Sequence, residues 1–290
     1  MSMFLKDLMS WAQAQLDAAQ LSYGHGTSDA RDEAAWLVLW RLRLPLDTNL
    51  DEHAHLTVDP EAVLAAEALI RERIETRKPA AYLTREAWLQ GVPFYVDERA
   101  IVPRSFIAEL IADGGIDPFL GAHTQSVLDL CTGNGSLAVL AAMAWPEVHV
   151  TAADFSPDAL EVARINVEKH HMEDRIQLVH SDGLRDCPGP FDLILCNPPY
   201  VNAQSMKALP AEYRAEPELA LAGGEDGMDF VRHLMADAPA RMSPTGVLVL
   251  EIGHERPHFE AAFPQVEAIW LSTSAGDDQV LLLTRDDLLA

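Results

Sequence analysis

The chain has 290 residues, of which 49% are hydrophobic and 23% charged, with 21 Lys and Arg against 45 Asp and Glu. The formal net charge of −24 would repel nucleic acid phosphates, so we expect a basic protein partner and no direct nucleic-acid binding. No apolar run approaches the roughly 18–20 residues that span a bilayer, and Lys6 and Asp7 interrupt the apolar N-terminus, so we expect neither membrane association nor a signal peptide.

The first 85 residues are predicted to form a small helical domain. Apolar side chains recur at three- to four-residue intervals between residues 5 and 19, which is the spacing of one face of an amphipathic helix. Asp29 is suited to cap a second helix. The Asp-Pro-Glu sequence at 59–61 predicts the start of a third helix, because it combines an N-cap, a first-turn proline and an early acid.

Residues 86–105 are predicted to form a connecting β-hairpin, because apolar β-formers flank a glycine and an Asp-Glu pair. From residue 106 to 290 strands and helices alternate, which predicts a Rossmann-like, doubly wound α/β domain. Its seven strands are expected at 126–130, 149–153, 176–180, 191–196, 246–252, 266–271 and 280–284. The connection between the last two is too short for a crossover helix, so we expect the last strand to be antiparallel.

The first of these strands runs into a glycine loop of the form D-x-x-x-G-x-G, from Asp129 to Gly135. Gly133 and Gly135 let the backbone turn sharply and approach a ligand. Asp154 ends the next strand, where it can accept hydrogen bonds from both hydroxyls of a ribose. The loop lacks the third glycine of dinucleotide-binding loops, and Asp129 would repel a diphosphate but attract an ammonium group, so the pattern favours S-adenosylmethionine. A tight turn without a ligand is the alternative, and it leaves Asp154 unexplained.

Further residues near the glycine loop are predicted to contact this cofactor. Cys131, Thr132 and Asn134 belong to the loop itself. Phe155 can pack on the adenine face, although an aromatic side chain at a strand end is also common in a core. Asp182 ends the third strand, where it can accept a hydrogen bond from the adenine amino group or cap a helix.

Cysteine and histidine spacing argues against metal and disulfide chemistry. The three cysteines have no C-x-x-C spacing and the eleven histidines no H-E-x-x-H spacing, so we expect a cytoplasmic protein with no metal site. No serine lies in a G-x-S-x-G sequence, which argues against a serine hydrolase.

The tetrapeptide Asn197-Pro198-Pro199-Tyr200 follows the fourth strand, whose carboxyl end borders the same crevice as the glycine loop. An amide or exocyclic aromatic NH₂ group is a poor nucleophile, because its lone pair is delocalised. The side-chain carbonyl of Asn197 and the backbone carbonyl of Pro198 can accept its two N–H groups and hold the nitrogen in line with a methyl carbon. The prolines offer no competing N–H, and Tyr200 can pack on the planar target group. We expect these four residues to carry the chemistry, with Asn197 also contacting the cofactor; a turn without function is the alternative.

The tetrapeptide resembles the Asp/Asn-Pro-Pro-aromatic motif of methyltransferases that use S-adenosylmethionine to modify either adenine N6 or glutamine N5. Three further segments are similar to the protein glutamine N5-methyltransferase family: Gly91–Arg104, Glu216–Gly227 and Leu248–Gly253. With the helical N-terminus, the resemblance covers nearly the whole chain. It implies a seven-stranded methyltransferase domain at 106–290 and a substrate-recognition domain at 1–85, although the latter could simply cover the catalytic domain.

Within this family the chain resembles the branch that modifies protein three of the large ribosomal subunit. The release-factor branch is expected to have P-R-P-D-T-E after the hairpin and G-T-G-x-G in the loop, whereas this chain has Pro-Arg-Ser-Phe at 103–106 and Cys-Thr-Gly-Asn-Gly at 131–135. The 209–217 segment is also similar to the ribosomal-protein branch. The resemblance implies methyl transfer from S-adenosylmethionine to the amide nitrogen, N5, of a glutamine in that basic ribosomal protein. Phe106 departs from the pattern, because a proline is expected there, and Ser136 replaces a common Ala or Cys.

Three alternatives stay open at this point. Glutamine methylation of peptide-chain release factors would use the same chemistry on another protein. Adenine N6-methylation of ribosomal RNA would share the motif, but we see no basic cluster in the sequence to dock RNA. A non-catalytic protein that retains the fold would have no need of Asp129, Asp154 and the tetrapeptide together.

Overall fold

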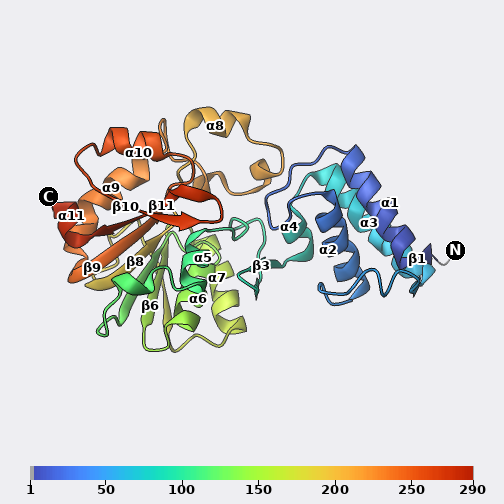
Figure 1. Cartoon of the computed structure of the whole chain (residues 1–290), viewed down its shortest axis with the longest axis horizontal. Coiled ribbons are helices and arrows are strands. Elements are labelled where there is room, and N and C mark those ends of the chain that lie inside the picture. The colour runs from blue at the N-terminus through green and yellow to red at the C-terminus, as the bar shows by residue number, and fades with distance from the viewer. Residues whose placement is uncertain (1–2, 290) are drawn as a thin grey trace. The chain divides into compact units, whose positions relative to one another are not determined.

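The structure, a computed structural model, describes residues 3–289 of the chain. The chain divides into two compact units (Figure 1). The helical unit comprises the chain up to Ala87 and the short segment Pro210–Glu216, and the sheet unit comprises Trp88–Leu209 and the chain from Pro217 onward. The chain therefore leaves the sheet unit after Leu209, contributes seven residues to the helical unit and returns at Pro217. This excursion has no counterpart in the predicted order of domains.

The helical unit begins its helices at the predicted caps. Asp29 accepts hydrogen bonds from the backbone N–H groups of Arg31 (2.8 Å) and Asp32 (3.0 Å), and Asp59 accepts one from Glu61 (2.9 Å). The elements are β1 (Met3–Phe4), α1 (Leu5–Ala18), α2 (Ala30–Leu42), β2 (Thr57–Val58), α3 (Pro60–Thr76), α4 (Ala80–Thr84) and the 3₁₀ turn η2 (Tyr213–Ala215). The helices α1, α2 and α3 pack against one another through their apolar faces, and β1 pairs antiparallel with β2.

The sheet unit contains a seven-stranded sheet in the order β10-β11-β9-β8-β5-β6-β7. Its strands are β5 (Ser126–Leu130), β6 (His149–Asp154), β7 (Ile176–His180), β8 (Phe191–Cys196), β9 (Met242–Glu251), β10 (Ile269–Thr273) and β11 (Gly276–Thr284). The strands from β5 to β9 pair in parallel, and β11 pairs antiparallel with both β9 and β10. The predicted doubly wound α/β class and its antiparallel last strand are confirmed.

One strand begins later in the structure than the sequence predicts. We expected it at 266–271, whereas β10 starts at Ile269. The backbone N–H of Val266 instead donates to the carbonyl of Phe263 in a turn (3.1 Å) after helix α10 (Arg256–Ala262).

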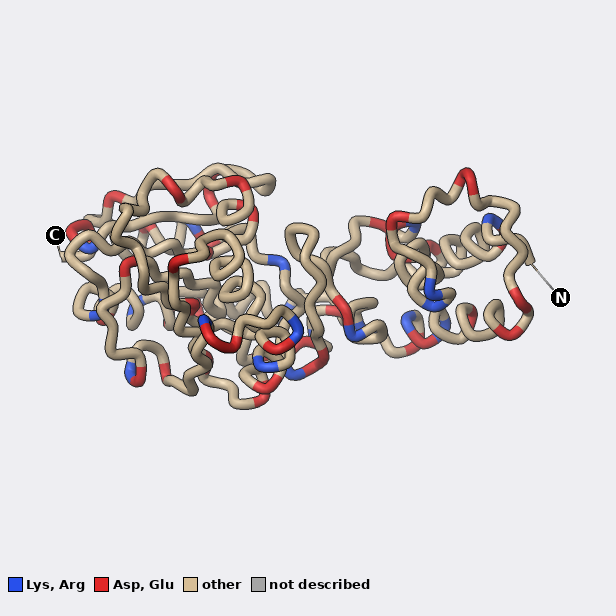
Figure 2. Tube along the Cα trace, turned by 90° about the horizontal axis from the view of Figure 1, so that it is seen from below, with Lys and Arg blue, Asp and Glu red and all other residues tan. Residues whose placement is uncertain are grey.

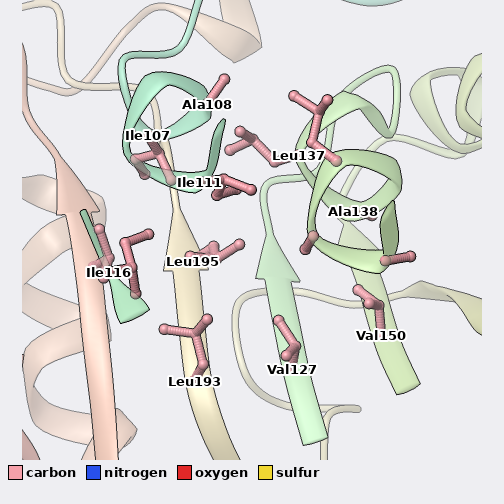
Figure 3. Close-up of a cluster of buried hydrophobic side chains, with 14 of the residues drawn as sticks. Ile107, Ala108, Ile111, Ile116, Val127, Leu137, Ala138, Val150, Leu193 and Leu195 are labelled. Atoms are coloured by element: carbon pink, nitrogen blue, oxygen red, sulfur yellow. The ribbon is translucent and has the colours of Figure 1, made fainter. Parts of the chain in front are cut away.

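Helices cover both faces of the sheet (Figure 1). In chain order the remaining elements are β3 (Ala87–Leu89), β4 (Val92–Phe94), α5 (Ile107–Ala112), η1 (Asp117–Phe119), α6 (Ser136–Ala144), α7 (Pro157–Lys169), α8 (Ala203–Ala208), η3 (Glu218–Ala220), α9 (Asp229–Asp237), η4 (Ala238–Ala240) and α11 (Arg285–Leu289). The side chains of α5 and α6 pack against Val127, Leu193 and Leu195 (Figure 3), and those of α9 pack on the other face with Leu128 and Ile194. This alternation follows from the two-residue period of a strand, and burial of each such side chain contributes about 1.5–3 kcal/mol.

Glu251, at the end of β9, holds the segment that leads into α5. Its carboxylate is fully buried and accepts hydrogen bonds from Ser105 Oγ (2.6 Å) and from the backbone N–H of Phe106 (2.9 Å). Burial raises the pKa of Glu251 to about 7. A proline at position 106 could not donate this bond, which gives a physical reason for the departure from the family pattern.

Residues 3–289 include no helix with the length and apolar composition that a membrane span requires. Nor do they bring three or more His, Cys, Asp or Glu side chains together in a way that could hold a metal ion.

Candidate active site

Three loops leave the sheet at the carboxyl ends of the parallel strands β5, β6 and β8. β5 lies between the other two, with Leu130 level with both Ala153 and Cys196. Together with flanking segments, these loops line a cavity of about 260 Å³, slightly below the roughly 300–1,000 Å³ common for small-molecule sites. The predicted site residues that line it are Cys131, Gly133, Asp154, Phe155, Asp182, Asn197 and Pro199.

Asp129 is fully buried on β5, just before the glycine loop. Its Oδ2 accepts hydrogen bonds from Thr132 Oγ1 and from the backbone N–H of Ala138 (3.0 Å), whereas its buried Oδ1 has no hydrogen-bond partner among residues 3–289. Burial raises the pKa of Asp129 to about 7. A buried carboxylate with an unpartnered oxygen is costly in a protein interior, and a nearby cation would stabilise it.

The two glycines of the loop have different reasons to be glycine. Gly133 has a φ of +55°, and a Cβ added there would meet no atom within 4 Å, so its backbone borders open space on the cavity wall. Gly135 has a φ of +81°, and a Cβ there would lie 3.1 Å from Cβ of Ala163 on α7. The first glycine therefore leaves room for a ligand, and the second allows a helix to pack closely.

Asp154, at the end of β6, is oriented by two backbone groups. Its Oδ2 accepts a hydrogen bond from Gly133 N (2.8 Å), and its Oδ1 accepts one from Ser156 N (2.8 Å). Each carboxylate oxygen has a second lone pair, so both can also accept a bond from a ribose hydroxyl. Burial raises the pKa of Asp154. The adjacent Phe155 ring lines the cavity and is 55% exposed, as an adenine-stacking side chain would be before its ligand binds.

Two thiols lie side by side at the strand ends. Cys131 lines the cavity with a φ of +61°, and its thiol is hydrogen-bonded to that of Cys196, the last residue of β8. This hydrogen bond and burial raise the pKa of Cys131 well above its ordinary value. Cys131 therefore contributes a neutral, polarisable wall to the cavity.

The Asn-Pro-Pro-Tyr loop presents neutral groups at the end of β8. Asn197 lines the cavity, and its side-chain amide makes no hydrogen bond within the described part of the chain, so its carbonyl is available as an acceptor. Pro198 is buried and Pro199 contributes to the cavity wall. No ionisable group other than the tyrosine hydroxyl lies in the tetrapeptide. This loop can accept N–H groups without placing a charge beside them.

Three glycines from distant segments make room for Tyr200. A Cβ on Gly253 would lie 2.6 Å from Cε2 of the Tyr200 ring, and one on Gly223 would lie 2.7 Å from its Cα. A Cβ on Gly227 would collide with the carbonyl oxygen of Tyr200. In the sequence these glycines belong to segments that carry the family resemblance. In the structure they let the tetrapeptide lie close against neighbouring backbone.

The remaining predicted site residues lie outside the cavity wall: Asp129, Thr132, Asn134, Gly135, Pro198 and Tyr200. Thr132 and Asn134 are used within the loop, the first as a donor to Asp129 and the second as an acceptor for the N–H of Ser136 (3.2 Å). Their contribution in this structure is to fold the loop around its ligand-facing backbone.

Part of the cavity wall was not predicted from the sequence. The cavity-lining residues that were not predicted are Arg99, Ala100, Ile101, Ser156, Ala159, Gly183, Pro217, Leu219, Ala220 and Phe230. Arg99 is fixed by a bidentate pair with Asp97, at 2.9 and 2.7 Å, which lowers the pKa of Asp97 to about 2. The first three and Pro217 to Ala220 belong to segments that carried the family resemblance, so that resemblance was the available signal.

A second, larger cavity of about 560 Å³ shares Asp182, Gly183 and Phe230 with the first. It extends towards Arg185 and Arg241, and it is lined by Leu130 but by neither glycine of the glycine loop and by no residue of the tetrapeptide. Size alone would favour this cavity, but the smaller one holds the groups whose chemistry is specific.

Comparison with known proteins identifies the family of the chain. The chain is 52% identical over 287 residues to a ribosomal protein uL3 glutamine methyltransferase of Bordetella pertussis, covering 98% of this chain and 96% of that protein. It is 49% identical to the corresponding protein of Burkholderia pseudomallei, covering 99% and 96%. The chain belongs to the family of ribosomal protein uL3 glutamine methyltransferases.

Two further comparisons bear on the methyltransferase fold of this family member. A family model described as methyltransferase small domain matches residues 116–212. Among solved structures, the catalytic domain of hMettl16 in complex with an RNA hairpin is similar with a TM-score of 0.52 and 13% identity, over 78% of this chain and 81% of that one. At that identity the likeness shows the fold alone.

Proposed function

We propose that this chain transfers a methyl group from S-adenosylmethionine to the side-chain amide nitrogen of a glutamine in ribosomal protein uL3. The observation that carries the proposal is the neutral Asn-Pro-Pro-Tyr loop set beside the buried acids of the glycine loop. Membership of the uL3 glutamine methyltransferase family names the substrate. Such a substrate also implies activity in the cytoplasm.

The cofactor would be held by the residues after β5, β6 and β7. Asp129 would face the ammonium group, Asp154 the ribose hydroxyls, and Phe155 and Asp182 the adenine, while Gly133 leaves the space that the cofactor needs. When bound, S-adenosylmethionine supplies an electrophilic methyl group on a positively charged sulfur, which departs as a neutral thioether with the electron pair of its bond to the methyl carbon.

The tetrapeptide would supply the orientation and polarisation that an amide nitrogen requires. Asn197 Oδ1 and the Pro198 carbonyl accept the two N–H groups of the glutamine amide, which holds the nitrogen in place and favours its lone pair. Once the nitrogen–carbon bond forms, the nitrogen loses one proton to solvent, so no side chain has to act as a strong base. Tyr200 packs on the planar amide and limits its rotation.

The charge of the chain fits a basic protein substrate. Asp and Glu residues occur along the traces of both units, with fewer Lys and Arg between them (Figure 2). Such a field steers a basic ribosomal protein towards the enzyme and speeds its association. The helical unit would recognise that protein.

The test is transfer of labelled methyl from S-adenosylmethionine to three purified substrates in parallel: unmethylated uL3, an unmethylated release factor and ribosomal RNA. We expect label on uL3 alone, located on a glutamine side chain by mass spectrometry. Label on the release factor would support glutamine methylation but show that the protein substrate is a release factor and not uL3. Label on RNA would show that the reaction is adenine methylation. Absence of label on all three, from protein that binds S-adenosylmethionine, would contradict the proposed function.

A further inference from the structure

The 201–222 segment, called the strap here, begins directly after Tyr200 and is closed at its base in the sheet unit. The backbone N–H of Val201 donates to the carbonyl of Leu221 (2.8 Å), and Gly223 donates to the carbonyl of Val201 (2.9 Å). These bonds fix the two ends of the strap beside each other. The intervening residues are therefore free to reach elsewhere without disturbing the tetrapeptide.

The middle of the strap, Pro210–Glu216, belongs to the helical unit. There Glu212 is fully buried, and its Oε1 lies 2.8 Å from Arg77 Nε and 3.5 Å from an Nη of Arg73. Arg73 is itself buried and also pairs with Glu33 of α2 at 2.8 Å. Separating such a buried pair would leave an uncompensated charge in the interior, so this cluster holds the middle of the strap in its place.

A second set of contacts fixes the same segment. Glu216 is buried, and its Oε2 lies 3.4 Å from Nε2 of His25. The ring of Tyr213 lies over the ring of His25 with a centroid distance of 4.2 Å. A Cβ on Gly24 would lie 2.6 Å from the Tyr213 hydroxyl oxygen, so the backbone at Gly24 leaves room for that ring.

The returning part of the strap forms one wall of the cofactor cavity. Pro217 follows Glu216 directly, and Pro217, Leu219 and Ala220 line the cavity of about 260 Å³. The Leu219 side chain is 56% exposed. The wall is thus attached at one end to the base of the strap and at the other to Glu216, which is buried beside His25 in the helical unit.

We propose that Glu212, with Arg77, is a positioning residue: by anchoring the strap in the helical unit it sets the place of the Pro217–Ala220 wall, and so links the helical unit to cofactor affinity. The proposal rests on the proposed function for the identity of the cofactor. It assigns the Leu-Pro-Ala-Glu-Tyr segment, so far only a mark of family resemblance, a physical role. Glu212 touches neither cofactor nor substrate in this account.

The test compares Glu212→Gln and Arg77→Gln with Glu33→Gln as the matched control. All three remove a charge from the same cluster, but Glu33 lies on α2 and pairs with Arg73 and Thr27, which are both outside the strap. Binding of S-adenosylhomocysteine by calorimetry and kcat and KM for methyl transfer to uL3 are measured, with thermal unfolding recorded for each variant. We expect Glu212→Gln and Arg77→Gln to weaken cofactor binding roughly 5- to 50-fold, Arg77→Lys to restore part of it, and Glu33→Gln to keep wild-type affinity.

Several outcomes would overturn the proposal. One is wild-type cofactor affinity in Glu212→Gln or Arg77→Gln together with a lowered unfolding temperature, because that describes a merely structural ion pair. An equal loss in Glu33→Gln would also do so. Should Glu212→Gln not fold, Arg77→Gln decides, because the Arg77 side chain is 31% exposed and its loss is milder. Cofactor binding is measured without uL3, so a wild-type protein that binds cofactor but leaves uL3 unmodified would refute the proposed function and not the strap.

Discussion

The loops after β5 and β8 lie at the same edge of the sheet and are built in opposite ways. The β5 loop has two acids at its sides, the buried Asp129 and the partly buried Asp154, each with a raised pKa and each tied to the loop by hydrogen bonds. The β8 loop carries no acid or base, and it is held by close packing of Tyr200 against glycine backbone. One loop holds negative charge in a buried place, and the other avoids charge.

This difference matches the two ligands of a methyl transfer to an amide. The donor is a cation with an ammonium group, and a buried carboxylate stabilises it strongly. The acceptor is a neutral amide, which needs carbonyl groups at fixed positions and would be disfavoured beside a charge. Variants that alter one loop alone should therefore change either cofactor binding or methyl transfer, and not both equally.

The largest effect is expected from Asn197→Ala. Loss of one carbonyl acceptor should lower kcat for methyl transfer about 10²–10³-fold, with a far smaller change in cofactor affinity. The matched control is Asn202→Ala in the same loop region, whose side chain bonds Glu255 and Ser205 and does not line the cavity. Steady-state kinetics and calorimetry measure both quantities. A fall in cofactor affinity as large as the fall in kcat would contradict the division between the loops.

Gly253→Ala tests the packing of the neutral loop. A Cβ at 2.6 Å from the Tyr200 ring must displace it, and a shift of the tetrapeptide by about 1 Å should lower kcat by up to roughly 10²-fold. Gly91→Ala serves as the control, because Gly91 has a φ of +75° but open space where its Cβ would lie. The Gly91→Ala variant therefore has a similar backbone strain, but its Cβ does not collide with any side chain. Equal kcat values in the two variants would refute the packing argument.

Asp129→Asn tests the charged loop. Removing the charge should weaken S-adenosylmethionine binding about 10- to 100-fold, which is the loss of a charge-assisted hydrogen bond. Asp192→Asn is the control, because Asp192 also accepts two hydrogen bonds through one carboxylate oxygen, here from two backbone N–H groups, but lies near the amino end of β8. Titration calorimetry measures both dissociation constants. Unchanged affinity in Asp129→Asn would show that the charge of Asp129 does not contribute to binding the cationic cofactor.

Phe106→Pro should have the smallest effect, and it bears on stability rather than activity. It removes the N–H that donates to Glu251, at a cost of about 1.5–3 kcal/mol, while the proline ring restores roughly 0.4–1 kcal/mol by restricting the unfolded chain. The free energy of unfolding in urea should fall by about 1–2 kcal/mol. Phe106→Ala keeps the N–H and separates the lost ring from the lost bond. A Phe106→Pro protein as stable as wild type would show that this hydrogen bond contributes little.

Much of the fold could be predicted from the sequence, because local signals determine it. Asp29 and Asp59 are caps whose side chains bond the next turn, and short, nearly continuous apolar runs mark the central strands of a sheet buried on both faces. The glycine loop and the tetrapeptide also follow their strands directly. Their meeting in space is a consequence of parallel strand order, and the fold class and family are confirmed.

The rest depends on contacts between residues far apart in the chain. Nothing next to Phe106 in sequence reveals Glu251, which lies 145 positions later and accepts its N–H. Glu212 looks like a surface acid until Arg73 and Arg77 are placed beside it. The roles of the individual site residues and the domain boundaries at 85 and 105 stay predictions.

The most direct test of the charged loop is the dissociation constant of S-adenosylmethionine as a function of pH between about 5.5 and 8.5, for wild type and Asp129→Asn. The pKa of Asp129 is about 7 in the free protein, and a bound cation favours the ionised carboxylate and lowers that pKa. Binding should therefore be tightest above pH 7 and weaken about tenfold for each pH unit below it in the wild type, with a flat profile in Asp129→Asn. Asp154 also has a raised pKa, so a profile that persists in Asp129→Asn would assign the titration to Asp154. A flat wild-type profile would contradict the central claim that a buried carboxylate meets the cation of the cofactor.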